Sequence, residues 1–210
     1  MKKASHFFKE EEKKKIEEAV HAVECCTIGE VAVMVVDSSD EYREAAVLGG
    51  ILFAAVAAFS ITEIVFGSSL TFFIPLSVFL SFPFIKLFSI LPALKIAFIG
   101  RRRREETVRD RAVRAFFEKG LYKTKANTGV LFFLSLLERK VWVLADKGIY
   151  EKINQETLDR FALTVSQGVK EGRTCDALCS AIDAAGKVLS QHFPIEPGDT
   201  NELPDTVITE

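Results

Sequence analysis

An almost uncharged block between Ala45 and Gly100 limits what this chain can fold into more than any other feature. The whole chain has 56 Lys, Arg, Asp and Glu residues, and only Glu63, Lys86 and Lys95 of these fall within the block. Charged residues occupy about a third of the remaining positions, which is typical of a water-soluble domain. Because the block has room for about two membrane spans, the chain is neither one uniform soluble domain nor a polytopic transporter. We expect one soluble domain with a membrane insert.

The apolar block predicts a hairpin of two transmembrane helices. Residues 45–66 are long enough to cross a hydrocarbon core that is roughly 30 Å thick. After a turn at residues 67–69, residues 70–87 are expected to form the return span. Residues 88–99 are then expected to lie along the membrane interface, although the sequence leaves a transmembrane position open for them. The second apolar stretch is interrupted by three prolines, Pro75, Pro83 and Pro92.

The charges that flank the block predict its orientation. Lys2 and Lys3 lie at the start of the chain, and Arg101–Arg104 follow the block directly, whereas the turn carries no basic residue. Since basic flanks stay in the cytoplasm, we expect a multi-pass protein of a bacterial inner (cytoplasmic) membrane with both termini cytoplasmic. No apolar stretch follows the basic start, so a signal peptide is not expected. The expected partner is the lipid bilayer and not nucleic acid, because the net charge is −2.

Small residues repeat along one face of the expected hairpin. Ala46, Gly50, Ala54 and Ala58 recur every four residues on the first span, and two serines do so on the second. The serines are Ser77 and Ser81. Small residues at this spacing let helix backbones approach closely. We expect a close contact, either within the hairpin or between subunits.

The charged parts of the chain read as one α/β domain that the hairpin interrupts. Residues 1–44 form its first part, residues 45–100 the hairpin with its interfacial segment, residues 101–192 the remainder, and residues 193–210 an acidic flexible tail. Amphipathic periodicity and β-branched runs predict the elements. Helices are expected at residues 9–26, 105–120, 156–170 and 175–191, and strands at residues 30–36, 130–137 and 140–145.

Acidic residues at the ends of the expected strands are the candidates for chemistry, because the sequence has no phosphate-binding glycine loop and no HExxH or GxSxG motif. Glu30 begins the first strand, Asp37 follows it, and Asp146 follows the last one. If these carboxylates converge, they make a hard oxygen site suited to Ca²⁺ or Mg²⁺. Arg139 is the candidate for binding an anion. For each of the four, an ordinary solvated turn residue is the preferred interpretation, and the site is the alternative.

A series of short motifs resembles the TPM domain family, and the bacterial membrane subgroup of that family in particular. The resemblance covers most of residues 5–192 and rests on the order of the motifs more than on any one of them. The motifs are Phe8–Glu12, Gly29–Val33, Asn127–Leu131, Glu138–Val141 and Ala145–Ile149, followed by His192–Pro194 and Asn201–Asp205. Many members carry Asp-Asn-Gly where this chain has Asn127-Thr128-Gly129, which is one acidic group fewer.

The resemblance implies an α/β sandwich with a central mixed sheet. It also implies one of three activities assigned within the family, namely acid phosphatase activity, Ca²⁺ binding, or the assembly and repair of membrane complexes. We therefore expect a membrane-anchored interaction or quality-control module for membrane protein complexes. The alternative is a divalent-metal-dependent, phosphatase-like hydrolase, in which the three carboxylates hold the cation and Arg139 stabilises a phosphoryl oxygen.

Overall fold

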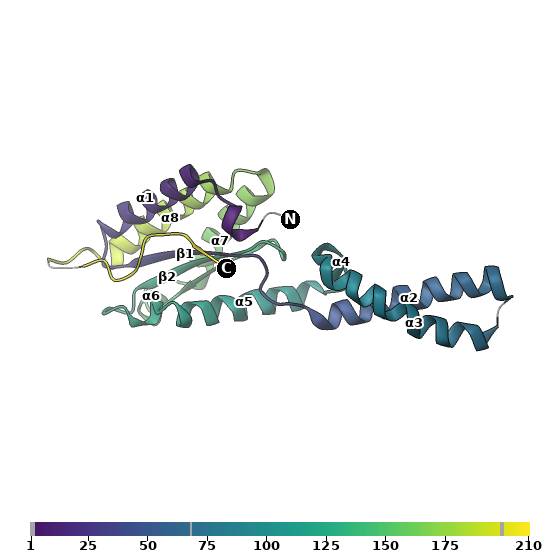
Figure 1. Cartoon of the computed structure of the whole chain (residues 1–210). Helices are drawn as coiled ribbons and strands as arrows, with labels where there is room; N and C mark the ends of the chain where they lie inside the picture. The colour runs from purple at the N-terminus through teal and green to yellow at the C-terminus, as the bar shows by residue number, and fades with distance from the viewer. Residues whose placement is uncertain (1–2, 68, 198–199) are drawn as a thin grey trace. The chain divides into compact units, whose positions relative to one another are not determined.

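The computed structural model describes residues 3–67, 69–197 and 200–210. The chain divides into two compact units (Figure 1). The first, the sheet unit, consists of Met1–Ser39 and Glu105–Glu210, and the second, the hairpin unit, consists of Asp40–Arg104. The hairpin unit is therefore an insertion between the first strand of the sheet unit and the rest of it.

The described part of the sheet unit is built on a mixed sheet with the strand order β3-β2-β1-β4. Strand β1 (Glu30–Val36) runs parallel to β2 (Gly129–Ser135), with Glu30 opposite Gly129 and Val36 opposite Ser135. Strand β3 is antiparallel to β2, and the short strand β4 is parallel to β1. Their bounds are Lys140–Ala145 and Ile208–Thr209. The predicted α/β class with a central mixed sheet is confirmed.

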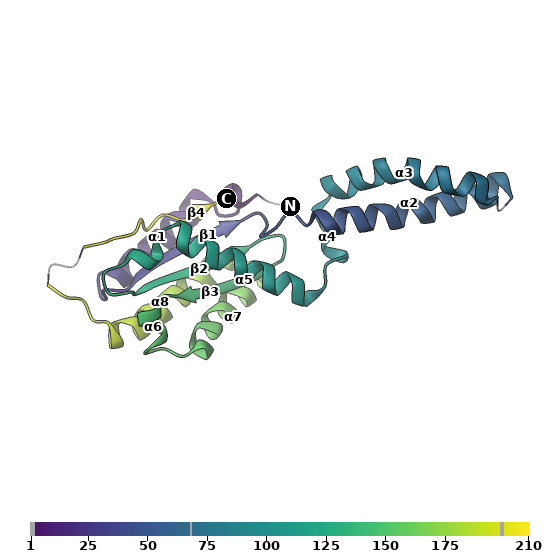
Figure 2. The same ribbon diagram turned by 90° about the horizontal axis from the view of Figure 1, so that it is seen from below.

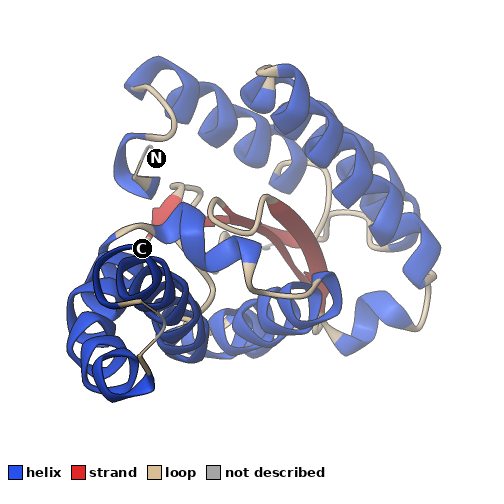
Figure 3. Ribbon diagram, turned by 90° about the vertical axis from the view of Figure 1, so that its right-hand side faces the viewer, coloured by secondary structure: helices blue, strands red, loops and turns tan. Residues whose placement is uncertain are grey.

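Helices cover both faces of this sheet (Figure 3). Residues Val31, Val33 and Val35 of β1 pack in one core with α1, α7 and α8. The alternate residues Ala32 and Met34 pack in a second core with α5, because successive side chains of a strand point to opposite faces. Strand β1 is thus buried on both faces, as its apolar run predicts. The helices are α1 (Glu10–Glu24), α5 (Arg101–Glu118), α7 (Gln155–Glu171) and α8 (Thr174–His192), with the short helices η1 (Ala4–His6), η2 (Leu121–Lys123) and α6 (Lys147–Tyr150) between them.

In the hairpin unit, α2 (Arg43–Phe66) and α3 (Leu70–Ile90) run side by side (Figures 1 and 2). The predicted small-residue face of α2 is buried within this pair, and Ala54 and Ala58 are at most 1% exposed. A Cβ atom built on Gly50 would lie 2.7 Å from the Cα atom of Ile85, so only glycine allows this approach. The close contact therefore forms inside the hairpin, which was one of the two arrangements expected.

The second arm differs from its predicted form. Helix α3 continues to Ile90, through Pro75 and Pro83, and α4 (Pro92–Ala97) follows it. Each internal proline removes a single backbone donor, and apolar helices tolerate such losses when the rest of the hydrogen-bond ladder is intact. Helix α3 ends before Pro92. Pro92 lies in the first turn of α4, where a backbone N–H would have no partner within the helix, so a proline is tolerated there. The predicted break after residue 87 is therefore three residues too early.

The segment predicted to be a flexible tail instead completes the sheet. Strand β4 pairs with Met34 and Val35 of β1. Asp37 donates its backbone N–H to the Glu210 carbonyl at 2.9 Å, and Glu210 donates to the Val35 carbonyl at 3.0 Å. The outer edge of a buried strand needs partners for its N–H and C=O groups, and the end of the chain supplies them.

Candidate functional site

The three predicted carboxylates lie at two different ends of the sheet. Glu30 begins β1, and Asp146 follows β3 beside the start of β2, since β3 runs antiparallel to β2. Two strand spacings, roughly 10 Å, separate these two positions. Asp37 follows the opposite end of β1, roughly 23 Å from Glu30 at about 3.3 Å per residue. The structure therefore does not bring the three residues together.

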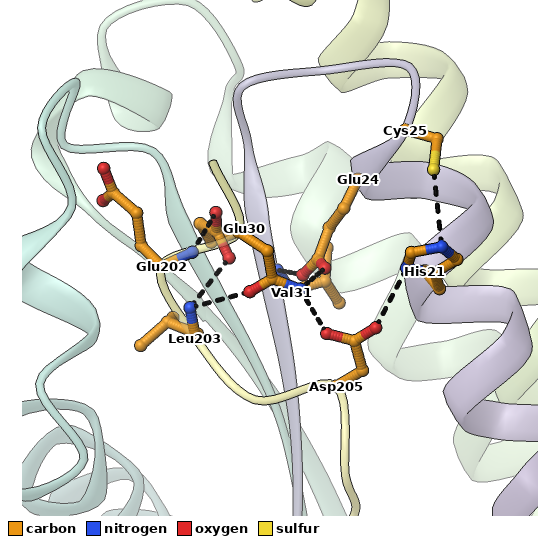
Figure 4. A network of polar contacts seen from close by, with 9 residues as sticks. His21, Glu24, Cys25, Glu30, Val31, Glu202, Leu203 and Asp205 are labelled. Carbon is orange, nitrogen blue, oxygen red and sulfur yellow. Dashed lines mark hydrogen bonds and ion pairs between the residues drawn. The ribbon is translucent and has the colours of Figure 1, made fainter. Parts of the chain in front are cut away.

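Glu30 binds the C-terminal segment of the chain. Its side chain is 4% exposed and accepts backbone N–H groups from Glu202 at 3.0 Å and Leu203 at 3.3 Å (Figure 4). An acidic side chain at the start of an apolar strand needs such donors when it is buried. Glu30 thus anchors the segment that leads into β4.

Asp146 and Asp37 each hold a local backbone feature. Asp146 caps α6, and its Oδ1 atom accepts the Lys147 N–H at 2.7 Å. Asp37 accepts the Ala4 N–H at 2.5 Å and so fixes the N-terminal helix η1 against the end of β1. These are the ordinary structural uses of a carboxylate at a helix or strand end.

A resident Ca²⁺ or Mg²⁺ ion does not fit the predicted ligand set. Such an ion needs its oxygen ligands within about 2.6 Å, and the three carboxylates lie much farther apart than that allows. Among the described residues, no group of three or more His, Cys, Asp or Glu side chains is arranged to hold a metal ion.

A polar network that the sequence reasoning missed lies beside Glu30. Glu24, at the end of α1, accepts the Val31 N–H at 3.1 Å and the Asn201 side-chain amide at 3.1 Å. The same amide donates to Asp205 at 2.5 Å, and Asp205 also pairs with His21 at 3.2 Å. Figure 4 shows the side chains of Glu24, Glu30 and Asp205 at the start of β1. We call Glu24, Glu30, Asn201 and Asp205, with His21, the C-terminal clasp, because they join α1 and β1 to the last ten residues.

The clasp holds a carboxyl group that stays protonated at neutral pH. Burial raises the pKa of Glu24 to about 8; the Val31 N–H opposes this, whereas the negative charges of Glu30 and Asp205 and a hydrogen bond to Asp205 reinforce it. A sequence signal for Glu24 did exist. It follows Ile16 and Val20 at intervals of four residues, so it continues the buried face of α1.

The opposite end of the sheet unit contains a cavity of about 530 Å³ beside the turn that joins β2 and β3. We call it the turn pocket. Its apolar lining comes from the N-terminal segment, β2, β3 and α7, through Phe7, Leu134, Leu136, Val141 and Val169. Its polar lining consists of Ser135, Ser166, Arg139, Lys140 and Lys170.

Arg139, the predicted anion-binding residue, lies on the rim of the turn pocket. It is exposed and has a φ of 52°, in the left-handed region that glycine and asparagine adopt more readily. The structure thus places the sequence candidates Asp37 and Arg139 at the same end of the sheet. Asp37 positions the segment that carries Phe7, and Arg139 presents a cation at the pocket.

Comparisons with known proteins agree with this fold. Residues 94–188, from α4 into α8, match the family model described as the TPM domain, which confirms the resemblance for the motifs Asn127–Leu131, Glu138–Val141 and Ala145–Ile149 within that range. The NMR structure of the BA42 protein from the psychrophilic bacterium Bizionia argentinensis is similar, with a TM-score of 0.63 and 21% sequence identity over the whole of both chains. At that identity the similarity shows the fold alone. No curated protein matches the chain.

Proposed function

We propose that this chain, which carries a TPM domain over residues 94–188, is a membrane-anchored interaction module for membrane protein complexes. The hairpin unit is the anchor, and the sheet unit is the part that meets other proteins, in the cytoplasm. This role combines assembly or quality control of complexes with a permanent position at the inner membrane.

The observation that carries the proposal is that the hairpin unit exposes large apolar side chains on its outer surface. Small residues form the buried face of α2, whereas Leu70, Phe79 and Phe82 of α3 are at least 70% exposed. Both helices are long and apolar enough to cross a membrane. An apolar surface of this extent is unfavourable in water and suited to hydrocarbon.

Charges gather at the end of the hairpin unit where the chain enters and leaves it. Lys95 donates to the Glu41 carbonyl at 3.0 Å, and Arg103 lies 3.4 Å from Asp40 and 3.6 Å from Glu44. The far turn, at Gly67, has no basic residue near it in the sequence. This distribution supports an anchor whose charged end faces the cytoplasm.

The carboxylates favour interaction over hydrolysis. A metal-dependent hydrolase needs carboxylates gathered around a cation, and here they hold a strand edge, a helix cap and a terminal segment instead. The surface that the sheet unit offers in their place is the turn pocket.

Copurification tests the proposal. The tagged full chain, extracted from membranes in a mild detergent, should retain the same membrane proteins that it crosslinks to in intact cells. An unrelated two-span hairpin protein, expressed at the same level, is the control and should retain none of them. The proposal fails if the chain retains nothing specific while the purified protein hydrolyses phosphate esters.

A further inference from the structure

The turn pocket combines an apolar lining with a cationic rim that the described structure leaves uncompensated. Arg139 and Lys170 are exposed, and within the described residues neither forms an ion pair. Lys140, the third cation of the lining, pairs with Glu105 at 2.6 Å. The neighbouring acid Glu171 pairs with Arg173 instead. Two positive charges therefore remain at the mouth of an apolar cavity.

The acidic side chain in the turn itself does not neutralise this rim. Glu138 is 3% exposed and accepts the Ser39 N–H at 3.0 Å and the Ser135 hydroxyl. Ser39 in turn donates its own hydroxyl to Ser135 at 2.9 Å. These bonds turn the Glu138 carboxylate toward the protein interior and leave the outer side of the turn to Arg139.

Residues of the turn between β2 and β3 bind the chain both where it leaves the sheet unit and where it re-enters it. Ser39, the last residue before the insertion, is bound by Glu138, and Glu105, the first residue after it, is bound by Lys140. The turn pocket is therefore at the end of the sheet unit to which the apolar hairpin is covalently joined. If the hairpin spans a membrane, both chain connections at this end of the sheet unit lead directly into it.

We propose that the turn pocket binds an anionic phospholipid, an inference that rests on the proposed membrane anchoring. The phosphate lies between Arg139 and Lys170, where the guanidinium can donate two parallel hydrogen bonds to it. The first part of an acyl chain lies against Phe7, Val141 and Val169. A volume of about 530 Å³ is within the range of small-molecule sites and accepts this part of a lipid.

The apolar lining identifies the ligand as a lipid. A free phosphate would use the two cations only and would leave half of the pocket lining in contact with water. An anionic phospholipid satisfies both parts of the pocket, and anionic headgroups are attracted to clustered Lys and Arg at a membrane surface. Binding would fix the sheet unit against the bilayer at a second point besides the hairpin.

Photocrosslinking of the full chain in nanodiscs tests this proposal. The bilayer is phosphatidylcholine with a small fraction of phosphatidylglycerol that carries a diazirine on one acyl chain, and crosslinked peptides are mapped by mass spectrometry. We expect crosslinks in the α2–α3 hairpin and in residues 134–141 and 163–170. Phosphatidylcholine with the same diazirine should label the hairpin equally and the turn pocket about tenfold less.

Three variants locate the binding. In Arg139→Gln/Lys170→Gln, turn-pocket crosslinks to phosphatidylglycerol should fall by about tenfold while hairpin crosslinks stay constant. Lys152→Gln/Arg160→Gln is the matched control, because it removes two exposed cations outside the pocket and should label like the unmodified chain. Val169→Trp, which fills the pocket without changing charge, should also reduce the labelling.

The outcomes separate this inference from the proposed function. Hairpin crosslinks without turn-pocket crosslinks would overturn the lipid site and leave the membrane anchor intact. Equal pocket labelling by both lipids, or labelling that persists in Arg139→Gln/Lys170→Gln, would also overturn it. An absence of hairpin crosslinks would overturn the membrane anchor itself.

Discussion

At the scale of single residues, Glu24 shows how a carboxyl group becomes part of a folded interior. Its ordinary pKa of 4.5 rises to about 8 because it is buried beside Glu30 and Asp205. Between these pH values the folded chain holds a proton that the unfolded chain has released. The free energy of unfolding therefore falls as the pH rises from about 4.5 to about 8, and it levels off above that range.

Glu24→Gln should remove this loss of stability. Glutamine keeps the carbonyl oxygen that accepts the Val31 N–H and offers Asp205 an amide donor that does not ionise, but its nitrogen cannot accept the Asn201 amide. At pH 8 the variant should unfold at least about 3 °C higher than the unmodified chain, and near pH 5 this advantage should disappear. Fluorescence of Trp142, the single tryptophan, reports the transition of the sheet unit. Glu11→Gln, on the exposed face of α1, is the control, and an unchanged pH slope in Glu24→Gln would contradict the assignment.

At the scale of secondary-structure elements, the sequence predicts best where one pattern runs over many residues. The bounds of β1 match the predicted Glu30–Val36 because its apolar run begins and ends at acidic residues. Strand β4 escaped prediction because it has two residues and lies among prolines and acids. Its pairing depends on the open edge of β1, which is a property of the sheet and is absent from the local sequence.

Removal of residues 201–210 tests whether this short strand matters to the whole sheet unit. The truncation takes away the backbone donors that bind Glu30 and the edge partners of Val35 and Asp37. Since each lost bond to a buried group costs about 1–3 kcal/mol, the Trp142 transition should move down by at least about 5 °C. Glu30→Gln in the truncated chain should recover part of the loss, because the buried charge is gone. An unchanged transition would mean that the clasp contributes nothing to folding.

At the scale of the whole molecule, the distribution of charged residues along the sequence predicts that an apolar unit is inserted. The positions of the candidate site residues relative to one another could not be predicted without the sheet topology. Glu30, Asp37 and Asp146 each lie at a strand end, as predicted. Whether such residues converge depends on strand order and direction, and these are set by long-range pairing that a local pattern does not encode. The clasp was missed for the same reason, because Glu24 and Asp205 are 181 positions apart in the chain.

The proposed membrane anchor makes a prediction about the orientation of the whole molecule. If α2 and α3 both span the membrane, the chain returns to the side from which it entered, and Arg101–Arg104 at the exit favour the cytoplasm for that side. Protease added to inverted inner-membrane vesicles should therefore remove epitope tags at both ends of the chain and leave a protected hairpin fragment. Intact spheroplasts, which expose the opposite face, should keep both tags until they are permeabilised.

A single protected tag in the inverted vesicles would require an odd number of spans. That result would put the two parts of the sheet unit on opposite sides of the bilayer, although β1 and β2 join them by direct pairing. The intact sheet therefore predicts, independently of the charges, that both parts lie on one side of the membrane, and the charges assign that side to the cytoplasm.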